Sequence, residues 1–254
     1  MFKKTIFFCL LISFCVMGDT AQSSSSITAI DANTQAFSIK LRASRLVYPI
    51  DSKGVVLSVA NEHNYPILLQ TTVVPDTTNI SNTSARFIAV PPLFRLDANQ
   101  QAKLRILQAA GDVPADRESM YWVCVKGIPP RADDAWADSN VPVQNTSINV
   151  QLLVSNCIKL LVRPKEINGM SPLDMAEKLN WRLGPNGLIA NNPTPFYIHL
   201  SFLSLGENKV SELTHIAPFS THTFTLPTGR DDRVRWRAIT DLGGEGPLLE
   251  AKLK

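Results

Sequence analysis

The residues of this chain that could perform acid–base, metal or redox chemistry are few and scattered. The four histidines have no His-Glu-x-x-His spacing, and Cys124 and Cys157 are too far apart for a Cys-x-x-Cys redox centre. The sequence has neither a Gly-x-Ser-x-Gly elbow nor a phosphate-binding glycine loop. The acidic run Asp133, Asp134 and Asp138 is typical of a solvated loop rather than of a calcium site. We therefore predict no metal, no cofactor and no enzymatic activity, although a site assembled from distant residues stays open.

The first 18 residues have the layout of a secretory signal peptide. Lys3 and Lys4 precede an apolar run from Thr5 to Met17, and the small Gly18 suits signal peptidase. The run is shorter than the ~20 apolar residues of a membrane span, so we expect residues 1–18 to be removed on export and no membrane insertion afterwards. Removing two lysines from 25 basic residues leaves 23 against 22 acidic ones, a net charge near +1. This balance indicates no nucleic-acid partner.

Export would leave only Cys124 and Cys157 in an oxidising compartment, where a disulfide is the default state of such a pair. A bond between them would close a loop of roughly 32 residues, which corresponds to a stabilisation of roughly 3 to 4 kcal/mol in the chain-entropy model. We predict a structural disulfide.

Apolar residues recur with a period of two, which is typical of β-strands. The alternation is clear from Val55 to Val59 and again from Ile148 to Val154. Helical periodicity is limited to a short turn within Ser171 to Lys178, and 17 prolines favour short strands in β-sandwiches. The predicted fold class is all-β.

The chain divides near Arg163-Pro164, where an apolar strand ends in proline and a looser segment follows. Residues 19–35 are predicted to form a flexible arm, because this stretch is rich in Ser, Thr and Asn. An N-terminal β-domain at 36–164 and a C-terminal β-sandwich domain at 165–254 would follow it.

Several short segments, weak one by one, occur together in an order that is similar to one protein family, from about Phe37 to Asp241. They are Arg45-Leu46-Val47-Tyr48-Pro49, Asn61 with Tyr65-Pro66 and Gln70, Pro91-Pro92 with Arg95-Leu96, Leu104-Arg105-Ile106, Asp116-Arg117-Glu118-Ser119, Gly127-Ile128-Pro129-Pro130-Arg131, Ser155-Asn156-Cys157-Ile158-Lys159 and Asn192-Pro193-Thr194-Pro195-Phe196-Tyr197. In these segments the chain resembles the periplasmic chaperones of the chaperone–usher pathway. The long stretch from Gly127 to Asn145, bracketed by the two cysteines, is similar to the long-loop subfamily, which serves simple surface fibres or capsule-like antigens.

The resemblance implies two immunoglobulin-like β-sandwich domains at an angle, with a cleft between them, in a periplasmic protein. Its partners would be fimbrial or capsule-like fibre subunits that lack their last strand. The chaperone would lend them a strand and deliver them to an outer-membrane usher. Whether the free protein caps its own donor strands as a homo-oligomer is left open. One alternative is a fibre subunit or adhesin with an immunoglobulin-like fold, and another is a hydrolase built on a β-sandwich.

The resemblance also assigns roles to single residues. The donor strand would consist of Ile148, Val150, Leu152 and Val154. These side chains share one face of a strand, although the same alternation suits a strand of the chain's own core. Arg45 and Lys159 match the two cleft cations that anchor a client's terminal carboxylate and so set the register of the added strand. By pattern alone, Lys159 could instead extend along the surface to water.

Three further sets of residues match positions of the family. Phe37, Ile39 and Leu41 match a second donor strand, with a strand in the chain's own sheet as the alternative. Glu118, Arg163 and Asp241 match an ionic network between the domains. Pro129 and Pro130 match paired prolines near the usher-binding face.

Overall fold

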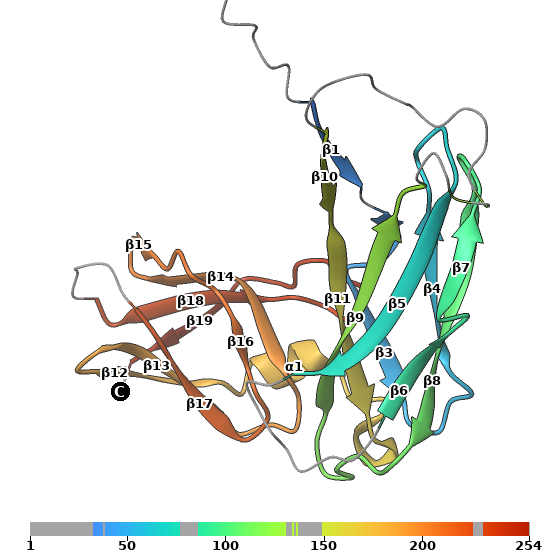
Figure 1. Cartoon of the computed structure of the whole chain (residues 1–254). Coiled ribbons are helices and arrows are strands. Elements are labelled where there is room, and N and C mark those ends of the chain that lie inside the picture. Colours follow the sequence, from blue (N-terminus) through green and yellow to red (C-terminus); the bar gives the residue numbers. More distant parts are fainter. Residues whose placement is uncertain are drawn as a thin grey trace, which may run out of the picture.

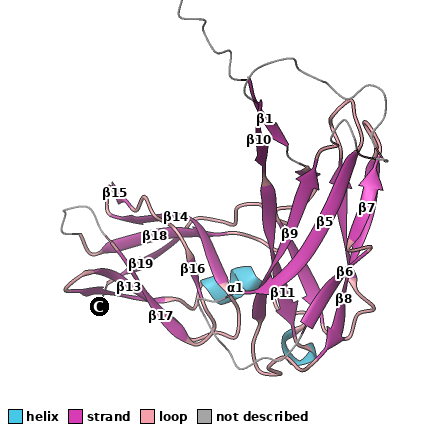
Figure 2. Ribbon diagram, viewed as in Figure 1, coloured by secondary structure: helices cyan, strands magenta, loops and turns pink. Residues whose placement is uncertain are grey.

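A computed structural model of the chain describes residues 33–37, 39–76, 86–130, 134, 136, 149–225 and 231–253. The predicted signal peptide, most of the predicted arm and Ile148 lie outside these residues. Within the described part, no helix is long and apolar enough to cross a membrane. Strands dominate and helices are short, as Figure 2 shows, so the predicted all-β class is confirmed.

The first domain is a sandwich of two sheets. One sheet has the order β3-β11-β9-β5-β7, from β3 (Arg45–Pro49), β11 (Ser155–Arg163), β9 (Ser119–Ile128), β5 (Ile67–Pro75) and β7 (Leu93–Leu96). The other has the order β2-β4-β8-β6, from β2 (Lys40–Leu41), β4 (Val55–Ala60), β8 (Gln101–Ala110) and β6 (Arg86–Val90). The period-two pattern turns alternate side chains inward, so Leu57, Leu104 and Val123 meet between the sheets.

The N-terminal segment changes sheets twice. β1 (Asn33–Phe37) pairs in parallel with β10 (Asn149–Leu153), β2 then pairs with β4, and β3 returns to pair in parallel with β11. At the change between β1 and β2, the Asn156 amide donates a hydrogen bond of 2.6 Å to the carbonyl of Ile39. Residues 33–35 of the predicted flexible arm therefore belong to a strand, because β10 offers them a partner edge.

The second domain is a smaller β-sandwich that follows a 3-10 helix (Lys165–Ile167) and a short helix, α1 (Pro172–Ala176). One sheet has the order β12-β13-β17, from β12 (Asn180–Gly184), β13 (Gly187–Asn192) and β17 (Ser220–Phe224). The other joins β15 (Asn208–Lys209), β14 (Ile198–Leu205), β18 (Arg233–Ala238) and β19 (Leu249–Lys252), with β16 (His215–Ile216) also on β14. Trp181, Phe196 and Trp236 lie in its core.

The two domains meet at an angle, with β9 and β11 of the first domain at the junction (Figure 1). Leu161 and Met120 from these strands form a small buried cluster with Tyr197 and Ala217 of the second domain. β11 is thus buried on both faces where it crosses the junction. This double burial accounts for the almost continuous apolar run from Ile158 to Val162.

Candidate functional site

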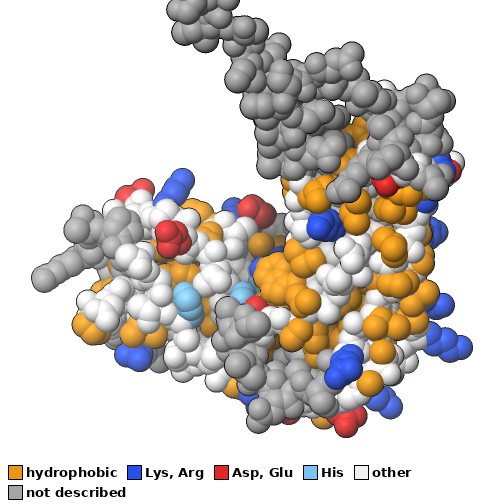
Figure 3. Space-filling model, viewed as in Figure 1, with side chains coloured by type: hydrophobic (Ala, Val, Ile, Leu, Met, Phe, Trp, Pro, Cys, Tyr) orange, Lys and Arg blue, Asp and Glu red, His pale blue; other side chains and the backbone are white. Residues whose placement is uncertain are grey.

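One face of the five-stranded sheet looks into the angle between the domains, and we call it the cleft face. Lys159, Leu161 and Arg163 of β11 lie on this face, because Ile158, Leu160 and Val162 point into the core. Their cross-strand neighbours on β9 include Trp122 and Met120. Figure 3 shows apolar side chains gathered on this domain beside the angle, with histidine side chains facing them from the other domain.

The structure brings Arg45 and Lys159 together on the cleft face. They are directly opposite each other in the parallel pairing of β3 with β11. Arg45 is only 9% exposed, and its Nε has no hydrogen-bond partner. Burial and, to a smaller extent, repulsion from Arg45 lower the pKa of Lys159 to about 8, while Asp76 acts in the opposite direction. Among the described residues neither cation forms an ion pair with a carboxylate, so the pair is suited to receive an anion.

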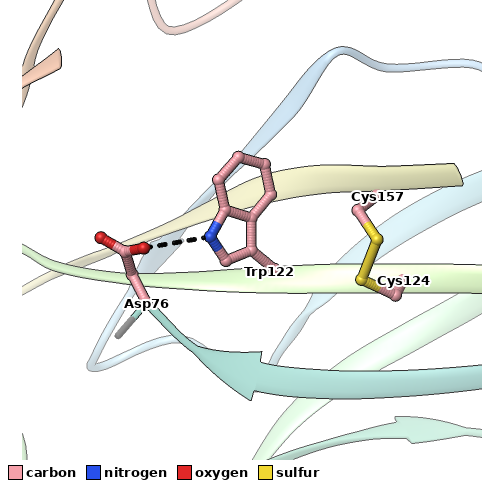
Figure 4. Close-up of a disulfide and its surroundings, with 4 residues drawn as sticks. All are labelled: Asp76, Trp122, Cys124 and Cys157. Atoms are coloured by element: carbon pink, nitrogen blue, oxygen red, sulfur yellow. Dashed lines mark hydrogen bonds between the residues drawn. A yellow bond between two sulfur atoms is a disulfide. The ribbon is translucent and has the colours of Figure 1, made fainter. Parts of the chain in front are cut away.

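Trp122 and Asp76 lie next to these cations, and the sequence analysis did not identify either of them. The Trp122 indole Nε1 donates a hydrogen bond of 3.3 Å to Asp76 Oδ1, as Figure 4 shows. The Lys159 ammonium nitrogen lies 5.7 Å from the centroid of a Trp122 ring, within the range of a cation–π contact. Neither residue belongs to a motif, so only the pairing of strands could place them beside Lys159.

The second domain contributes a row of aromatic and imidazole rings. The His199 ring lies 5.4 Å from that of His215, and the Tyr197 ring lies 5.4 Å from the same His215 ring. Burial lowers the pKa of His199 to about 2 and that of His215 to about 4, and the positive charge of Lys159 lowers both. Both imidazoles are therefore neutral at neutral pH.

Glu118, Arg163 and Asp241 are joined across the domain boundary. Arg163 donates to Glu118 Oε1 from Nε at 2.9 Å, and it contacts both carboxylate oxygens of Asp241 at 2.8 and 2.9 Å. The other Glu118 oxygen accepts a hydrogen bond of 2.9 Å from the backbone N–H of Tyr197. Burial raises the pKa of Glu118 to about 7, against the opposing effects of Arg163 and this N–H group. The network links the end of β11 and the residue before β9 to two segments of the second domain.

The predicted disulfide is confirmed. Cys124 and Cys157 are directly opposite each other on β9 and β11, with Cα atoms 4.0 Å apart. The bond lies on the cleft face, one pair of residues from Lys159 and Trp122 in the direction of β10. Figure 4 shows the disulfide together with Trp122.

The predicted donor residues surround β10. Val150 and Leu152 are in this strand, but their side chains, like the whole of Ile148, lie outside the described residues. Val154 is half-buried, and its neighbour Leu153 is 46% exposed. Among the described strands β10 pairs with β1 alone, which leaves its second edge for another partner.

Two residues of the second donor strand are placed differently from the prediction. Ile39 is 1% exposed and packs between the sheets, with its Cγ1 3.3 Å from where a Cβ on Gly127 would lie. Leu41 packs on the same core. For this pair the alternative of a strand in the chain's own sheet holds, because a side chain in the core cannot fill a partner's groove. Phe37 lies in β1, and its side chain is outside the described part.

Pro129 and Pro130 are both buried directly after β9. Little of either side chain is exposed, and the usher contact at this pair stays a prediction.

Comparison with known protein families follows the same two-domain division. Residues 38–168 match the model described as "Pili and flagellar-assembly chaperone, PapD N-terminal domain", and residues 174–248 match "Pili assembly chaperone PapD, C-terminal domain". The chain belongs to the pilus-assembly chaperones. Both matches are to chaperone domains, so the alternative of a fibre subunit or adhesin has no support.

Individual relatives agree with this assignment. The chaperone is 44% identical to the chaperone protein AggD of Escherichia coli over 232 residues, which cover 90% of each chain, and 42% identical to the chaperone protein caf1M of Yersinia pestis over 83% of its length and 84% of that relative. Among solved structures, the Escherichia coli chaperone DraB is 44% identical with a TM-score of 0.74, covering 88% of this chain and all of that one. The Salmonella enterica SafB chaperone, solved with the SafA pilin, is 38% identical with a TM-score of 0.72, covering 87% and 99%.

Proposed function

We propose that this chaperone binds fibre subunits in the periplasm by lending them a β-strand, and that it passes them to an outer-membrane usher. The observation that carries the proposal is the Arg45–Lys159 pair, a buried and a half-buried cation without a carboxylate partner among the described residues. Lys159 lies on β11, which follows β10 directly along the chain. The SafB relative was solved in complex with a pilin.

The geometry supports strand addition. A subunit that lacks its last strand has an unpaired sheet edge, which is a template for aggregation. β10 could pair with that edge through main-chain hydrogen bonds, while Ile148, Val150, Leu152 and Val154 fill the groove behind it. Burial of four aliphatic side chains contributes a gross gain of roughly 6 to 12 kcal/mol before the cost of ordering.

The two cations would fix the register of this added strand. A client's terminal carboxylate could accept charge-assisted hydrogen bonds from Arg45 and Lys159, and these are strong in a partly dry cleft. Register is critical because a slip of one residue turns every donor side chain to the wrong face. The disulfide between the anchor and β10 would keep the two parts of the site at a constant separation.

β1 would form part of the same strand-donating unit. It lies in parallel register on β10, with Phe37 opposite Leu153. Since Ile39 and Leu41 belong to the core, we limit the proposed second donor strand to Phe37 and the residues of β1 before it. Binding by this unit would be a non-covalent exchange without a cofactor, and no catalytic step is proposed.

The test is co-purification of a fibre subunit expressed in the periplasm from the same genome with the wild-type chaperone or with Lys159→Met. This change keeps most of the alkyl stem and removes the charge. We expect at least a tenfold loss of recovered complex, which corresponds to ~1.4 kcal/mol. Lys103→Met, on the exposed outer side of β8, is the matched control and should capture the subunit as the wild type does.

Circular dichroism and thermal unfolding of each variant separate loss of binding from loss of fold. If the folded Lys159→Met protein recovers as much subunit as the control, the anchor is not at Lys159 and the proposal fails.

A further inference from the structure

Asp76 follows β5 and lies beside a row of side chains that crosses the cleft face. Val74 of β5 is opposite Trp122 of β9, Trp122 is opposite Lys159 of β11, and Lys159 is opposite Arg45 of β3. The backbone N–H of Asp76 donates a hydrogen bond of 3.1 Å to the carbonyl of Met120, which continues the pairing of β5 with β9. β9 therefore lies between Asp76 and Lys159. Trp122, diagonal to Asp76 on this strand, contacts the Asp76 carboxylate with its N–H group and the Lys159 ammonium with its ring.

The Asp76 carboxylate is held away from Lys159 by its other contacts. Asp76 is 8% exposed, its Oδ1 accepts the hydrogen bond from Trp122 Nε1, and its Oδ2 lies 3.8 Å from His215 Nε2. His215 does not neutralise this carboxylate at neutral pH, because burial lowers its pKa to about 4. The Asp76–Lys159 distance exceeds that of a contact ion pair, yet the negative charge of Asp76 still raises the pKa of Lys159.

Without a client, Lys159 must stay charged and must also keep its hydrogen-bonding groups available for a carboxylate. Burial and the neighbouring Arg45 favour its neutral form, which could not bind a carboxylate. A carboxylate in direct contact would keep Lys159 charged, but it would also occupy the position that a client's carboxylate needs. A negative charge at longer range, behind an aromatic ring, meets both demands, since it favours the ammonium form without taking its hydrogen bonds.

We propose that Asp76 and Trp122 are positioning residues of the client anchor. Asp76 supplies the negative charge that keeps Lys159 protonated, and Trp122 holds Asp76 by its N–H group while its ring prevents the two side chains from closing into a direct ion pair. That the anchor serves a client's carboxylate rests on the proposed function, whereas the relation between these three side chains does not.

The decisive measurement is the pKa of Lys159 in the full chaperone without a client, from the pH dependence of its side-chain carbon resonance, assigned with Lys159→Met. Other groups facing Lys159 are Arg45 on β3, His199 on β14 and His215 on β16, and both histidines stay neutral throughout an alkaline titration. We expect Asp76→Asn to lower the pKa of Lys159 by roughly half a unit or more. Asp97→Asn, an exposed carboxylate paired with Arg95, is the control and should leave it unchanged.

Trp122→Ala is expected to act in the opposite direction, because Asp76 can then reach Lys159 and form a contact pair. The double variant Asp76→Asn with Trp122→Ala separates this effect from the extra water that a missing indole admits. If the rise in the pKa of Lys159 disappears in the double variant, the direct pair caused it. A rise that persists, or an unchanged pKa in Asp76→Asn, overturns the proposal. Where Trp122→Ala does not fold, Trp122→Leu, which also removes the ring but fills more of its space, takes its place in the same comparison.

Client capture gives a separate readout. Asp76→Asn should lose captured subunit at a lower pH than the wild type as the pH is raised, because its Lys159 becomes neutral earlier. If Lys159→Met captures subunits normally while the pKa shifts occur as expected, the proposed function fails and the inference about the three side chains stands. If Lys159→Met abolishes capture and Asp76→Asn changes neither the pKa nor the pH profile, the inference fails alone.

Discussion

At the scale of single residues, the character of each side chain in the cleft depends on which side of its strand it lies. Lys159 sits in an apolar run between Ile158 and Leu160, yet these neighbours point into the core and Lys159 points toward the second domain. The alternation of a strand thus places a charge at the centre of a buried junction without placing it in a core. The cost of this position appears in the pKa of Lys159, which burial lowers to about 8.

We predict that the buried histidines of the second domain lower the free energy of unfolding of the chaperone in acid. The pKa of His199 is about 2 in the folded protein, far below the ordinary value of about 6.5 that applies when the chain unfolds. The contribution of neutral His199 to the free energy of unfolding is therefore complete above about pH 6.5. It is lost progressively as the pH falls toward the pKa of His199 in the folded protein. Between pH 7 and pH 5 we expect the free energy of unfolding to fall by about 2 kcal/mol from this residue.

Urea unfolding at the two pH values measures this difference. His199→Phe keeps a ring in the same space, and its fall in stability between the two pH values should be smaller than that of the wild type by about 2 kcal/mol. His215 and Glu118, whose pKa values burial also shifts, contribute alike in both proteins, and His63→Phe in the first domain is the matched control. An equal pH dependence in wild type and His199→Phe would show that His199 is not the group responsible.

At the scale of elements, β9 and β11 carry most of the residues of the site. Their ladder carries the disulfide, the Lys159–Trp122 pair and the Leu161–Met120 pair in consecutive positions on one face. β10 precedes β11, and only Val154 separates the two strands. The orientation of the donor strand therefore depends on how rigid the adjoining end of the β9–β11 pair is.

Removal of the disulfide tests this dependence. We expect the Cys124→Ser and Cys157→Ser double variant to lower the free energy of unfolding by about 3 kcal/mol, since a closed loop of the unfolded chain is released. Capture of subunits should fall by more than this global loss explains, because the disulfide lies between the anchor and β10. Denaturant unfolding combined with co-purification at a temperature where the variant is folded gives both values, and capture equal to the wild type would contradict the second expectation.

At the scale of the whole molecule, an apolar cluster and a buried ionic network connect the two domains and fix the angle between them. The buried cluster of Met120, Leu161, Tyr197 and Ala217 supplies apolar contact, and Arg163 connects carboxylates on both sides of the boundary. Gly243 of the second domain also lies against Ser44, since a Cβ at this position would fall 2.1 Å from the serine Oγ. The contacts between the domains, rather than the packing inside either sandwich, therefore set the angle between the domains and the width of the cleft.

Arg163→Met and Asp241→Asn should differ strongly in their effect on this boundary. Arg163→Met leaves the buried Glu118 without its cation, which we expect to cost about 3 to 5 kcal/mol of stability. Asp241 is about one third exposed, so Asp241→Asn should cost only about 1 kcal/mol or less. Unfolding measurements with small-angle scattering, which detects a wider angle between domains, check both, and equal effects would show that Glu118 does not depend on Arg163.

The sequence by itself determined the class of the fold and its division into two β-domains. Period-two alternation and the prolines indicated sandwiches, and the export signal with two remaining cysteines predicted the disulfide between Cys124 and Cys157 that the structure confirms. These features are local, because strand patterning and the redox state of a cysteine pair depend on near neighbours and on the compartment.

Tertiary structure alone decided which residues form the site. Asp76, Trp122 and His215 are distant in sequence and belong to no motif, yet strand register and domain docking bring them to Lys159. Ile39 is a second example of what the sequence leaves undecided. Its alternating pattern fits a donor strand and a core strand equally well, and the structure places it in the core. Alternation states that a side chain faces one of two sides, and only the packing of the second sheet and the second domain decides what lies there.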